Sequence, residues 1–171
     1  MTVGILGLGL IGGSMARAYA LEGHTVLACE KDEHMLQFAM LAGAVHGKLD
    51  AEHISSCDLI LLAIYPAGSA SWLEHHAHLI RKDALVMDLC GIKREICRRC
   101  FPLAAQYGFT FVGGHPMAGS QFSGFKYSRA SLFADQPMVL VPPRFDDIML
   151  LDRCKQALAP CNFGRFSVTT A

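Results

Sequence analysis

The sequence predicts an α/β protein of the Rossmann-like, doubly wound kind, in which a mostly parallel sheet carries helices on both faces in three layers. Two observations predict this class. Short, almost wholly apolar runs alternate with longer helical patterns along the 171 residues, as is typical of strands buried on both faces. Glycines gather where those runs end, a distribution that favours an α/β protein holding a ligand against its backbone.

The expected strands are short runs of aliphatic, β-branched and aromatic residues. They are Val3–Leu6, Thr25–Cys29, Leu59–Ala63, Leu85–Asp88, Phe109–Val112, Met138–Val141 and Arg165–Val168. The segments between them are long enough to cross over as helices. These helices are expected at Ile11–Glu22, Glu33–Leu41, Ser69–Ile80, Lys93–Phe101 and Asp146–Leu158. Ligands of such sheets bind outside the carboxyl ends of the strands, so the residues just after each strand are the candidate site.

Composition limits the class of protein. The chain has 15 Lys+Arg and 15 Asp+Glu, 52% hydrophobic residues and a mean hydropathy of +0.32. This is too apolar for a disordered chain and lacks the basic excess of a nucleic-acid binder. The apolar N-terminus has no basic segment before it and is interrupted by glycines, which argues against a signal peptide or membrane span. We expect one cytoplasmic domain, residues 1–171, that binds neither nucleic acid nor membrane.

The first expected strand is followed at once by Gly7-Leu8-Gly9-Leu10-Ile11-Gly12, which opens a helix. The three glycines of this pattern serve a tight turn, the close approach of a pyrophosphate and the contact between helix and sheet. Backbone N–H groups and the positive end of the helix dipole bind the phosphates in such sites. The position of the motif after a strand favours a dinucleotide site over a glycine turn that serves packing alone.

The second and third strands end at residues that we expect to border the nucleotide. Glu30 stands where an acidic side chain accepts hydrogen bonds from the adenosine ribose and repels a 2′-phosphate, which favours NAD over NADP. Lys31 can offset that repulsion by swinging toward the ribose, and a solvated charge at a strand end is the alternative reading of Glu30. Further along, Pro66 stops the strand after Ala63 and leaves Tyr65 at the crevice, where it borders the cofactor or only packs.

The stretch Gly113–Ser120, Gly-Gly-His-Pro-Met-Ala-Gly-Ser, follows the fifth expected strand. Its small residues bring backbone close to a ligand and present one imidazole, that of His115. Imidazole exchanges a proton readily near neutral pH, and its neutral form accepts a hydrogen bond from a substrate hydroxyl that is being oxidised. We therefore predict that His115 is a catalytic residue.

The His-Pro-Met-Ala-Gly-Ser stretch, the glycine motif continued to Ser14, and Ser131–Asp135 resemble the prephenate/arogenate dehydrogenase family of tyrosine biosynthesis over essentially the whole chain. The resemblance implies NAD-dependent oxidative decarboxylation of prephenate to 4-hydroxyphenylpyruvate, without a metal, with the substrate hydroxyl polarised by His115. Arogenate, which would give tyrosine, is the alternative substrate. A non-catalytic NAD-binding module is the alternative class, against which the intact histidine stretch argues.

Two positions depart from the family pattern. The family's Asp-x-Gly-Ser-x-Lys reads Asp88-Leu89-Cys90-Gly91-Ile92-Lys93, so Gly91 replaces the serine that the resemblance assigns to orienting the histidine or the substrate. Gly91 is expected to allow close approach to the nicotinamide, and Lys93 keeps the family's lysine without an assigned role. Gln121 stands where the family often has Glu, and with Ser120 it is expected to bind substrate as a neutral hydrogen-bonding group.

Family members continue beyond Thr169-Thr170-Ala171 into a helical domain that dimerises and contacts substrate. We therefore expect the chain to be a truncated piece of such a protein rather than a natural short module. On its own it should bind NAD but turn over prephenate poorly, and the whole protein should be a homodimer through that domain. Apolar surface that the helical domain would cover should be exposed and promote self-association.

The remaining cysteines and histidines are not expected to carry chemistry. Seven cysteines, an odd number scattered through apolar runs, are typical of reduced thiols packed in a core. Cys97 and Cys100 have metal spacing but no second pair, and they fall in a helical pattern. His75 and His78 also have helical metal spacing, without an evident third ligand. We expect no disulfide and no metal site.

Overall fold

A computed structural model describes all residues from Met1 to Ala171. Eight strands form one sheet in the order β3-β2-β1-β4-β5-β6-β7-β8, and every neighbouring pair is parallel except β6 with β7. The strands are β1 (Thr2–Leu6), β2 (Thr25–Cys29), β3 (Gly47–Lys48), β4 (Leu59–Leu62), β5 (Leu85–Asp88), β6 (Thr110–Pro116), β7 (Pro137–Val141) and β8 (Arg165–Val168). The strand order reverses direction between β1 and β4, as it does in doubly wound sheets.

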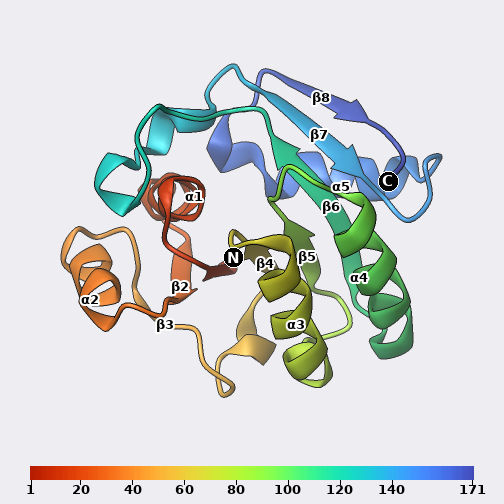
Figure 1. Cartoon of the computed structure of the whole chain (residues 1–171), viewed down its shortest axis with the longest axis horizontal. Helices are drawn as coiled ribbons and strands as arrows, with labels where there is room; N and C mark the ends of the chain where they lie inside the picture. The colour runs from red at the N-terminus through yellow and green to blue at the C-terminus, as the bar shows by residue number, and fades with distance from the viewer.

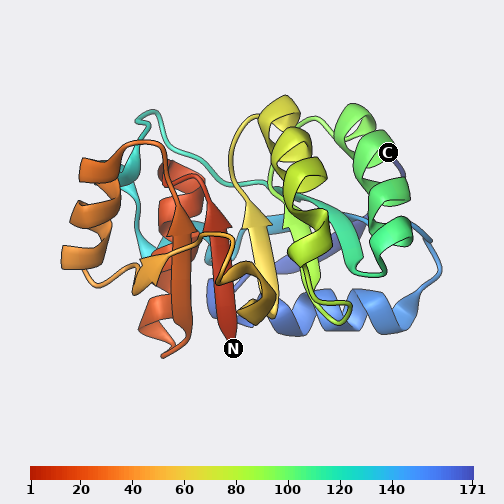
Figure 2. The same ribbon diagram turned by 90° about the horizontal axis from the view of Figure 1, so that it is seen from below.

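Helices cover both faces of the sheet, which confirms the predicted class (Figure 1). They are α1 (Leu10–Leu21), α2 (Glu33–Leu41), α3 (Pro66–His76), α4 (Arg94–Tyr107) and α5 (Ile148–Ala157). Buried residues of α1, α2 and α5 belong to one apolar cluster, and those of α3 and α4 belong to a second. Figure 2 shows α3 and α4 above the sheet and α5 below it.

Strand β4 illustrates why the strands lack polar alternation. Leu59 and Leu61 lie in the first cluster, whereas Ile60 and Leu62 lie in the second, because successive strand residues point to opposite faces. All four side chains are at most 1% exposed. Burial of each such side chain contributes roughly 1.5–3 kcal/mol, so both helical layers stabilise the same strand.

Strand β6 is longer than predicted, and the prediction that the histidine stretch begins in a turn after the strand is wrong. Gly113 to Pro116 are part of β6, and they pair antiparallel with β7 so that His115 lies opposite Val139. This pairing comes from a strand more than twenty residues away, so no local pattern announces it. The imidazole is therefore carried by a strand within the sheet.

Two adjacent glycines hide this part of β6 in the sequence, because glycine is depleted from strands. Close packing requires them here. A Cβ on Gly113 would lie 2.9 Å from the Cys97 sulfur, and one on Gly114 would lie 2.7 Å from the Asp88 carbonyl oxygen. The end of β6 thus runs tightly between β5 and α4 on the approach to His115.

Other boundaries differ from the prediction for local reasons. Helix α3 begins at Pro66 because proline needs no N–H partner in a first turn, and it ends at His76 before a short 3-10 turn, Ala77–Leu79. Helix α4 does not end at Phe101 but continues past Pro102, burying Ala104. It ends at Tyr107 and is capped by Gly108, whose φ is +86°. The two-residue strand β3 was not predicted.

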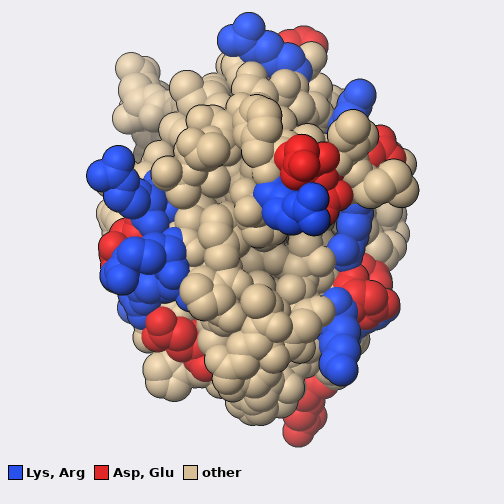
Figure 3. Space-filling model, turned by 90° about the vertical axis from the view of Figure 1, so that its right-hand side faces the viewer, with Lys and Arg blue, Asp and Glu red and all other residues tan.

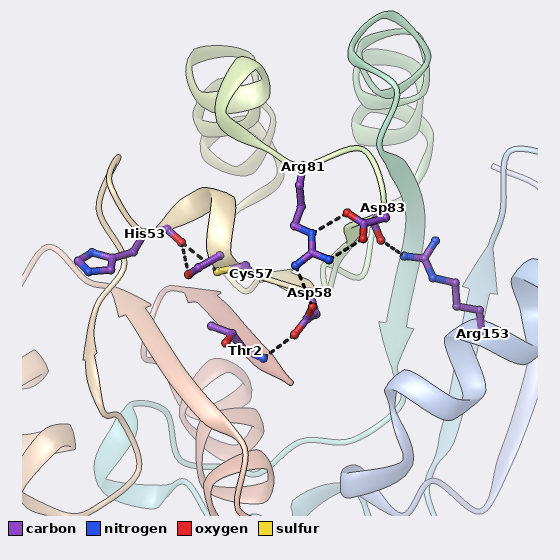
Figure 4. A network of polar contacts seen from close by, with 8 residues as sticks. Thr2, His53, Cys57, Asp58, Arg81, Asp83 and Arg153 are labelled. Carbon is purple, nitrogen blue, oxygen red and sulfur yellow. Dashed lines mark hydrogen bonds and ion pairs between the residues drawn. The ribbon is translucent and has the colours of Figure 1, made fainter.

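A polar network closes the amino ends of the central strands, at the edge opposite the carboxyl ends (Figure 4). The Asp58 carboxylate accepts the Thr2 backbone N–H at 2.7 Å and an Arg81 guanidinium N–H at 3.1 Å. Arg81 also donates to the Asp83 carboxylate, whose pKa this hydrogen bond lowers to about 2, and Arg153 donates to the Asp83 carbonyl. The network ties β1, β4 and α5 together on the side away from the candidate site.

Candidate nucleotide-binding and active site

The three motif glycines have different surroundings. Gly7 has a φ of +89°, and a Cβ there would overlap the side chain of Ile64. A Cβ on Gly12, inside α1, would overlap the carbonyl oxygen of Gly7, whereas one on Gly9 would meet nothing within 4 Å. The first and third glycines therefore serve the turn and the helix contact, and the second leaves open space beside the backbone. This cradle fits a pyrophosphate at the N-terminus of α1.

A cavity of about 530 Å³ lies beside this loop, at the carboxyl ends of β1, β4 and β5. It brings together eight residues predicted to bind cofactor, which are Gly7, Gly9, Ile11, Glu30, Ala63, Tyr65, Pro66 and Gly91. Five lining residues were not predicted, namely Leu8, Ile64, Leu89, Cys90 and Ile92. The cavity lies where the strand order reverses, the usual ligand position in an open α/β sheet.

The other three predicted cofactor residues lie outside this cavity. Gly12 is buried under the glycine loop, and Leu10 packs against the core at the start of α1. Lys31 lines a second hollow of about 570 Å³ that shares Glu30 and Tyr65 with the first. The two hollows together extend the crevice from the glycine loop toward α3.

The Glu30 carboxylate is held by backbone donors. One oxygen accepts the Leu8 N–H at 2.7 Å, and the other accepts the N–H groups of Lys31 and Asp32 at 2.8 and 3.1 Å. Glu30 therefore links the glycine loop to the end of β2. Since a carboxylate has about four acceptor positions, capacity remains for a ribose hydroxyl.

His115 reaches the same crevice from β6. A Cβ placed on Gly91, which lines the cavity, would lie 3.6 Å from the His115 Nε2, so the imidazole lies beside a lining residue although His115 itself does not line the cavity. Burial lowers the pKa of His115, the positive charge of Lys93 lowers it further, and Asp88 acts in the opposite direction. A neutral imidazole that accepts hydrogen bonds is therefore favoured at neutral pH.

Beside His115 lies an ion pair for which we had predicted no role. Asp88 ends β5 with its side chain fully buried, and the Lys93 ammonium, 11% exposed, donates to its carboxylate. The same ammonium donates to the Gly114 carbonyl oxygen at 2.6 Å. Burial raises the pKa of Asp88, and Lys93 opposes that rise. The signal in the sequence was an acidic residue closing an otherwise apolar strand, with a lysine soon after it.

The structure does not bring Ser120 and Gln121 to the cavity. Both are exposed in the loop after β6, and neither lines the hollow beside His115. The Ser120 hydroxyl accepts the Phe122 N–H at 3.2 Å within that loop. Their role in substrate binding stays a prediction.

Apolar side chains are exposed around the crevice. Tyr65 is 88% exposed and Ile92 is 71% exposed, and both line the cavity. Met117 and Phe122, each 50% exposed, follow the end of β6. Self-association through this surface stays a prediction.

A larger hollow, about 710 Å³, lies between α4 and α5 at the amino end of β6. Figure 3 views the side of the molecule that carries these helices, where charged side chains of both signs surround a mostly uncharged centre. Because ligands of open α/β sheets bind at the carboxyl ends, we assign the candidate site to the smaller cavity at the glycine loop.

The cysteines and histidines that we set aside lie in packed or solvated positions. All seven cysteines are free, and burial raises the pKa of Cys97 to about 11 and that of Cys100 to about 12. The His75 Nδ1 lies 2.7 Å from the Ser71 carbonyl oxygen of its own helix. No group of three or more His, Cys, Asp or Glu side chains is placed to hold a metal. None of the helices combines the length and apolar character needed to span a membrane.

Comparison with known proteins identifies similar sequences. The family described as "Prephenate dehydrogenase, nucleotide-binding domain" matches residues 15–166. The prephenate dehydrogenase of Bacillus subtilis (strain 168) is 26% identical over 166 residues, covering 94% of this chain and 44% of that protein. The chain therefore spans less than half the length of this curated relative.

Solved structures agree with the fold. The arogenate dehydrogenase of Synechocystis has a TM-score of 0.87 at 26% identity, over 99% of this chain and 60% of that one. The prephenate dehydrogenase from Aquifex aeolicus, solved in complex with hydroxyphenyl propionate and NAD+, has a TM-score of 0.80 at 23% identity. That match covers 99% of this chain and 60% of the Aquifex chain.

Proposed function

Since the chain belongs to the prephenate dehydrogenase family as its nucleotide-binding domain, we propose that it binds NAD+ in the cavity beside the glycine loop and serves the oxidative decarboxylation of prephenate to 4-hydroxyphenylpyruvate. The observation that carries the proposal is the position of the His115 imidazole beside Gly91, a residue that lines the cavity next to the glycine loop. An oxidoreductase needs its proton acceptor next to the hydride acceptor, and this arrangement supplies that proximity.

Residues of the chain have separate tasks in binding the dinucleotide. The open space at Gly9 and the N-terminus of α1 accept the pyrophosphate. The Glu30 carboxylate accepts a hydrogen bond from a ribose hydroxyl and repels a 2′-phosphate. Tyr65 and Gly91 border the nicotinamide end of the cavity. When bound, NAD+ supplies the hydride acceptor.

His115 acts as the catalytic base in this proposal. Its neutral imidazole accepts the proton of the substrate hydroxyl while the carbon that bears this hydroxyl loses hydride. The bond to the ring carboxylate then breaks, carbon dioxide leaves, and the released electron pair completes the aromatic ring. The phenolate oxygen takes the proton back from His115, so the imidazole ends neutral and no metal is needed to balance the reaction.

The lowered pKa of His115 predicts the acid limb of the pH profile. Only the neutral imidazole accepts the proton, so kcat/KM should stay high at pH 6.5 and fall only below the lowered pKa of His115. Steady-state rates of the protein at its natural length, measured from pH 5 to 8, would check this. An acid limb with its midpoint above pH 6.5 contradicts the assignment.

Two measurements test the function itself. Calorimetric titration of the 171-residue chain should give tighter binding of NAD+ than of NADP+, because Glu30 repels the additional phosphate. Prephenate added with NAD+ to the protein at its natural length should release carbon dioxide and reduced cofactor in equal amounts. Absence of dinucleotide binding, or NAD+ binding without turnover of either candidate substrate, would overturn the proposal.

Arogenate oxidation to tyrosine is a second candidate, favoured by the similarity to the Synechocystis arogenate dehydrogenase. The two substrates share the ring hydroxyl and carboxylate, so His115 would act identically on both. The ratio of kcat/KM for prephenate and arogenate decides between them. The family resemblance further leads us to propose a place in tyrosine biosynthesis, in the cytoplasm, for a homodimer.

A further inference from the structure

The segment of β6 that leads into His115 has no side chains that could hold the imidazole in place. The two residues before His115 are glycines, so they offer no side-chain contacts that could hold it. Gly91, which lies beside its Nε2, has no hydroxyl to donate or accept a hydrogen bond. Another group must fix the direction in which this imidazole points.

The Lys93 ammonium is that group by position. It donates to the Gly114 carbonyl oxygen at 2.6 Å, and that carbonyl belongs to the peptide unit that continues into the His115 N–H. Since a peptide unit is planar, holding its oxygen also fixes the orientation of the backbone that enters His115. On the opposite edge of the strand, Gly114 and His115 pair with Leu140 and Val139 of β7, so the ammonium holds the edge that β7 does not.

Asp88 anchors the ammonium at a cost in free energy. Its side chain is fully buried and pairs with Lys93, while its second oxygen has no hydrogen-bond partner. A buried acceptor without a partner destabilises a fold, and an apolar pair of similar volume would pack without that penalty. The contact of Lys93 with β6 therefore explains this ion pair better than a contribution to the free energy of unfolding does.

We propose that Lys93 is a positioning residue, which, anchored on the buried Asp88 carboxylate, holds the Gly114 carbonyl and thereby aims the His115 imidazole at the cofactor cavity. It supplies an orienting contact in a chain that has no hydroxyl at residue 91. The inference rests on the catalytic role proposed above for His115.

The pair also has an electrostatic effect on the imidazole, which tests that its two charges lie beside the ring. The charged groups that act on the imidazole are Lys93 at the start of α4 and Asp88 at the end of β5, and β7 contributes only the apolar Val139 opposite it. A nearby positive charge lowers the pKa of a histidine and a negative charge raises it. Removing each partner should therefore move the pKa of His115 in opposite directions.

The test uses four variants and two readouts. The variants are Lys93→Met, Asp88→Asn, the double variant that carries both changes, and Lys93→Arg. Lys155→Met, an exposed lysine of α5, is the matched control. Nuclear magnetic resonance of the His115 ring across pH, on the 171-residue chain, reads the pKa. Steady-state kcat and KM, measured on the protein at its natural length, show whether the His115 imidazole is still positioned for the reaction.

We expect Lys93→Met to raise the pKa of His115, Asp88→Asn to lower it, and the double variant to leave it near the wild-type value. The double variant has no unpaired buried charge, so it keeps the test open if a single variant fails to fold. Its kcat should nonetheless fall on the order of 10²-fold with KM for NAD+ unchanged, because the imidazole is no longer aimed. Lys93→Arg should recover part of kcat, and Lys155→Met should match wild type.

Each failure has a distinct signature. If the double variant keeps wild-type kcat while His115→Asn abolishes turnover, the positioning role is wrong and the proposed function stands. If His115→Asn itself keeps turnover, the proposed function is wrong. Shifts of the His115 pKa in one common direction for both single variants would also overturn the inference.

Discussion

Replacing His115 with asparagine should lower kcat by about 10²–10⁴-fold, the range for loss of a general base, while leaving NAD+ affinity nearly unchanged. Asparagine keeps a hydrogen-bonding side chain of smaller size but cannot take up a proton near neutral pH. The imidazole lies near the Cβ position of Gly91 and not near those of Gly7, Gly9 or Gly12, whose loop would carry the phosphates. Steady-state rates and calorimetric NAD+ titration of the same preparation measure the two quantities.

His34→Asn is the matched control, because the His34 side chain is 98% exposed at the start of α2. It should leave both kcat and NAD+ affinity at wild-type values. Equal losses of turnover and NAD+ affinity in His115→Asn would instead identify a structural histidine and contradict the catalytic assignment.

Replacing two glycines of the same motif with alanine should affect different properties, which are the stability of the fold at Gly12 and NAD+ affinity at Gly9. Gly12→Ala should lower the free energy of unfolding by about 3 kcal/mol, the upper end for overpacking, because its Cβ would overlap the Gly7 carbonyl oxygen. Gly9→Ala should unfold at the same denaturant concentration as wild type, since nothing lies within 4 Å of its Cβ position. Its methyl group would instead occupy the space expected for a pyrophosphate.

Gly9→Ala should therefore weaken NAD+ binding by at least about tenfold, equivalent to about 1.4 kcal/mol. Urea titrations give the free energies of unfolding, and calorimetry gives the affinities of the folded variants. Unchanged NAD+ affinity in Gly9→Ala would show that the dinucleotide binds elsewhere. A Gly12→Ala protein as stable as wild type would mean that α1 can move away from the loop without cost.

The fold was predictable because local pattern and global burial agree in most of the chain. Strands such as β4 are apolar on both faces, and that pattern in turn indicates helices on both sides of the sheet. The same agreement located the crevice, since Gly7, Glu30 and Tyr65 each follow a strand and converge on one cavity. Their binding roles stay predictions.

What could not be predicted depends on partners distant in the sequence. The extension of β6 through His115 requires pairing with β7, and two glycines conceal it. The role of Lys93 required knowing that α4 begins beside the end of β6, where its ammonium meets both Asp88 and the Gly114 carbonyl. Residue spacing along a chain carries no information about such cross-element hydrogen bonds.

The antiparallel pairing of β6 with β7 also decides which parts of the molecule are free to move during a reaction cycle. A histidine on a loop can move with its backbone, whereas the backbone of His115 is paired with β7 and cannot move away without breaking the sheet. The loop that follows Pro116 is exposed and belongs to no strand, so it is not held in this way. If His115 has the role proposed for it, the backbone that carries the proton acceptor stays in place throughout the reaction cycle.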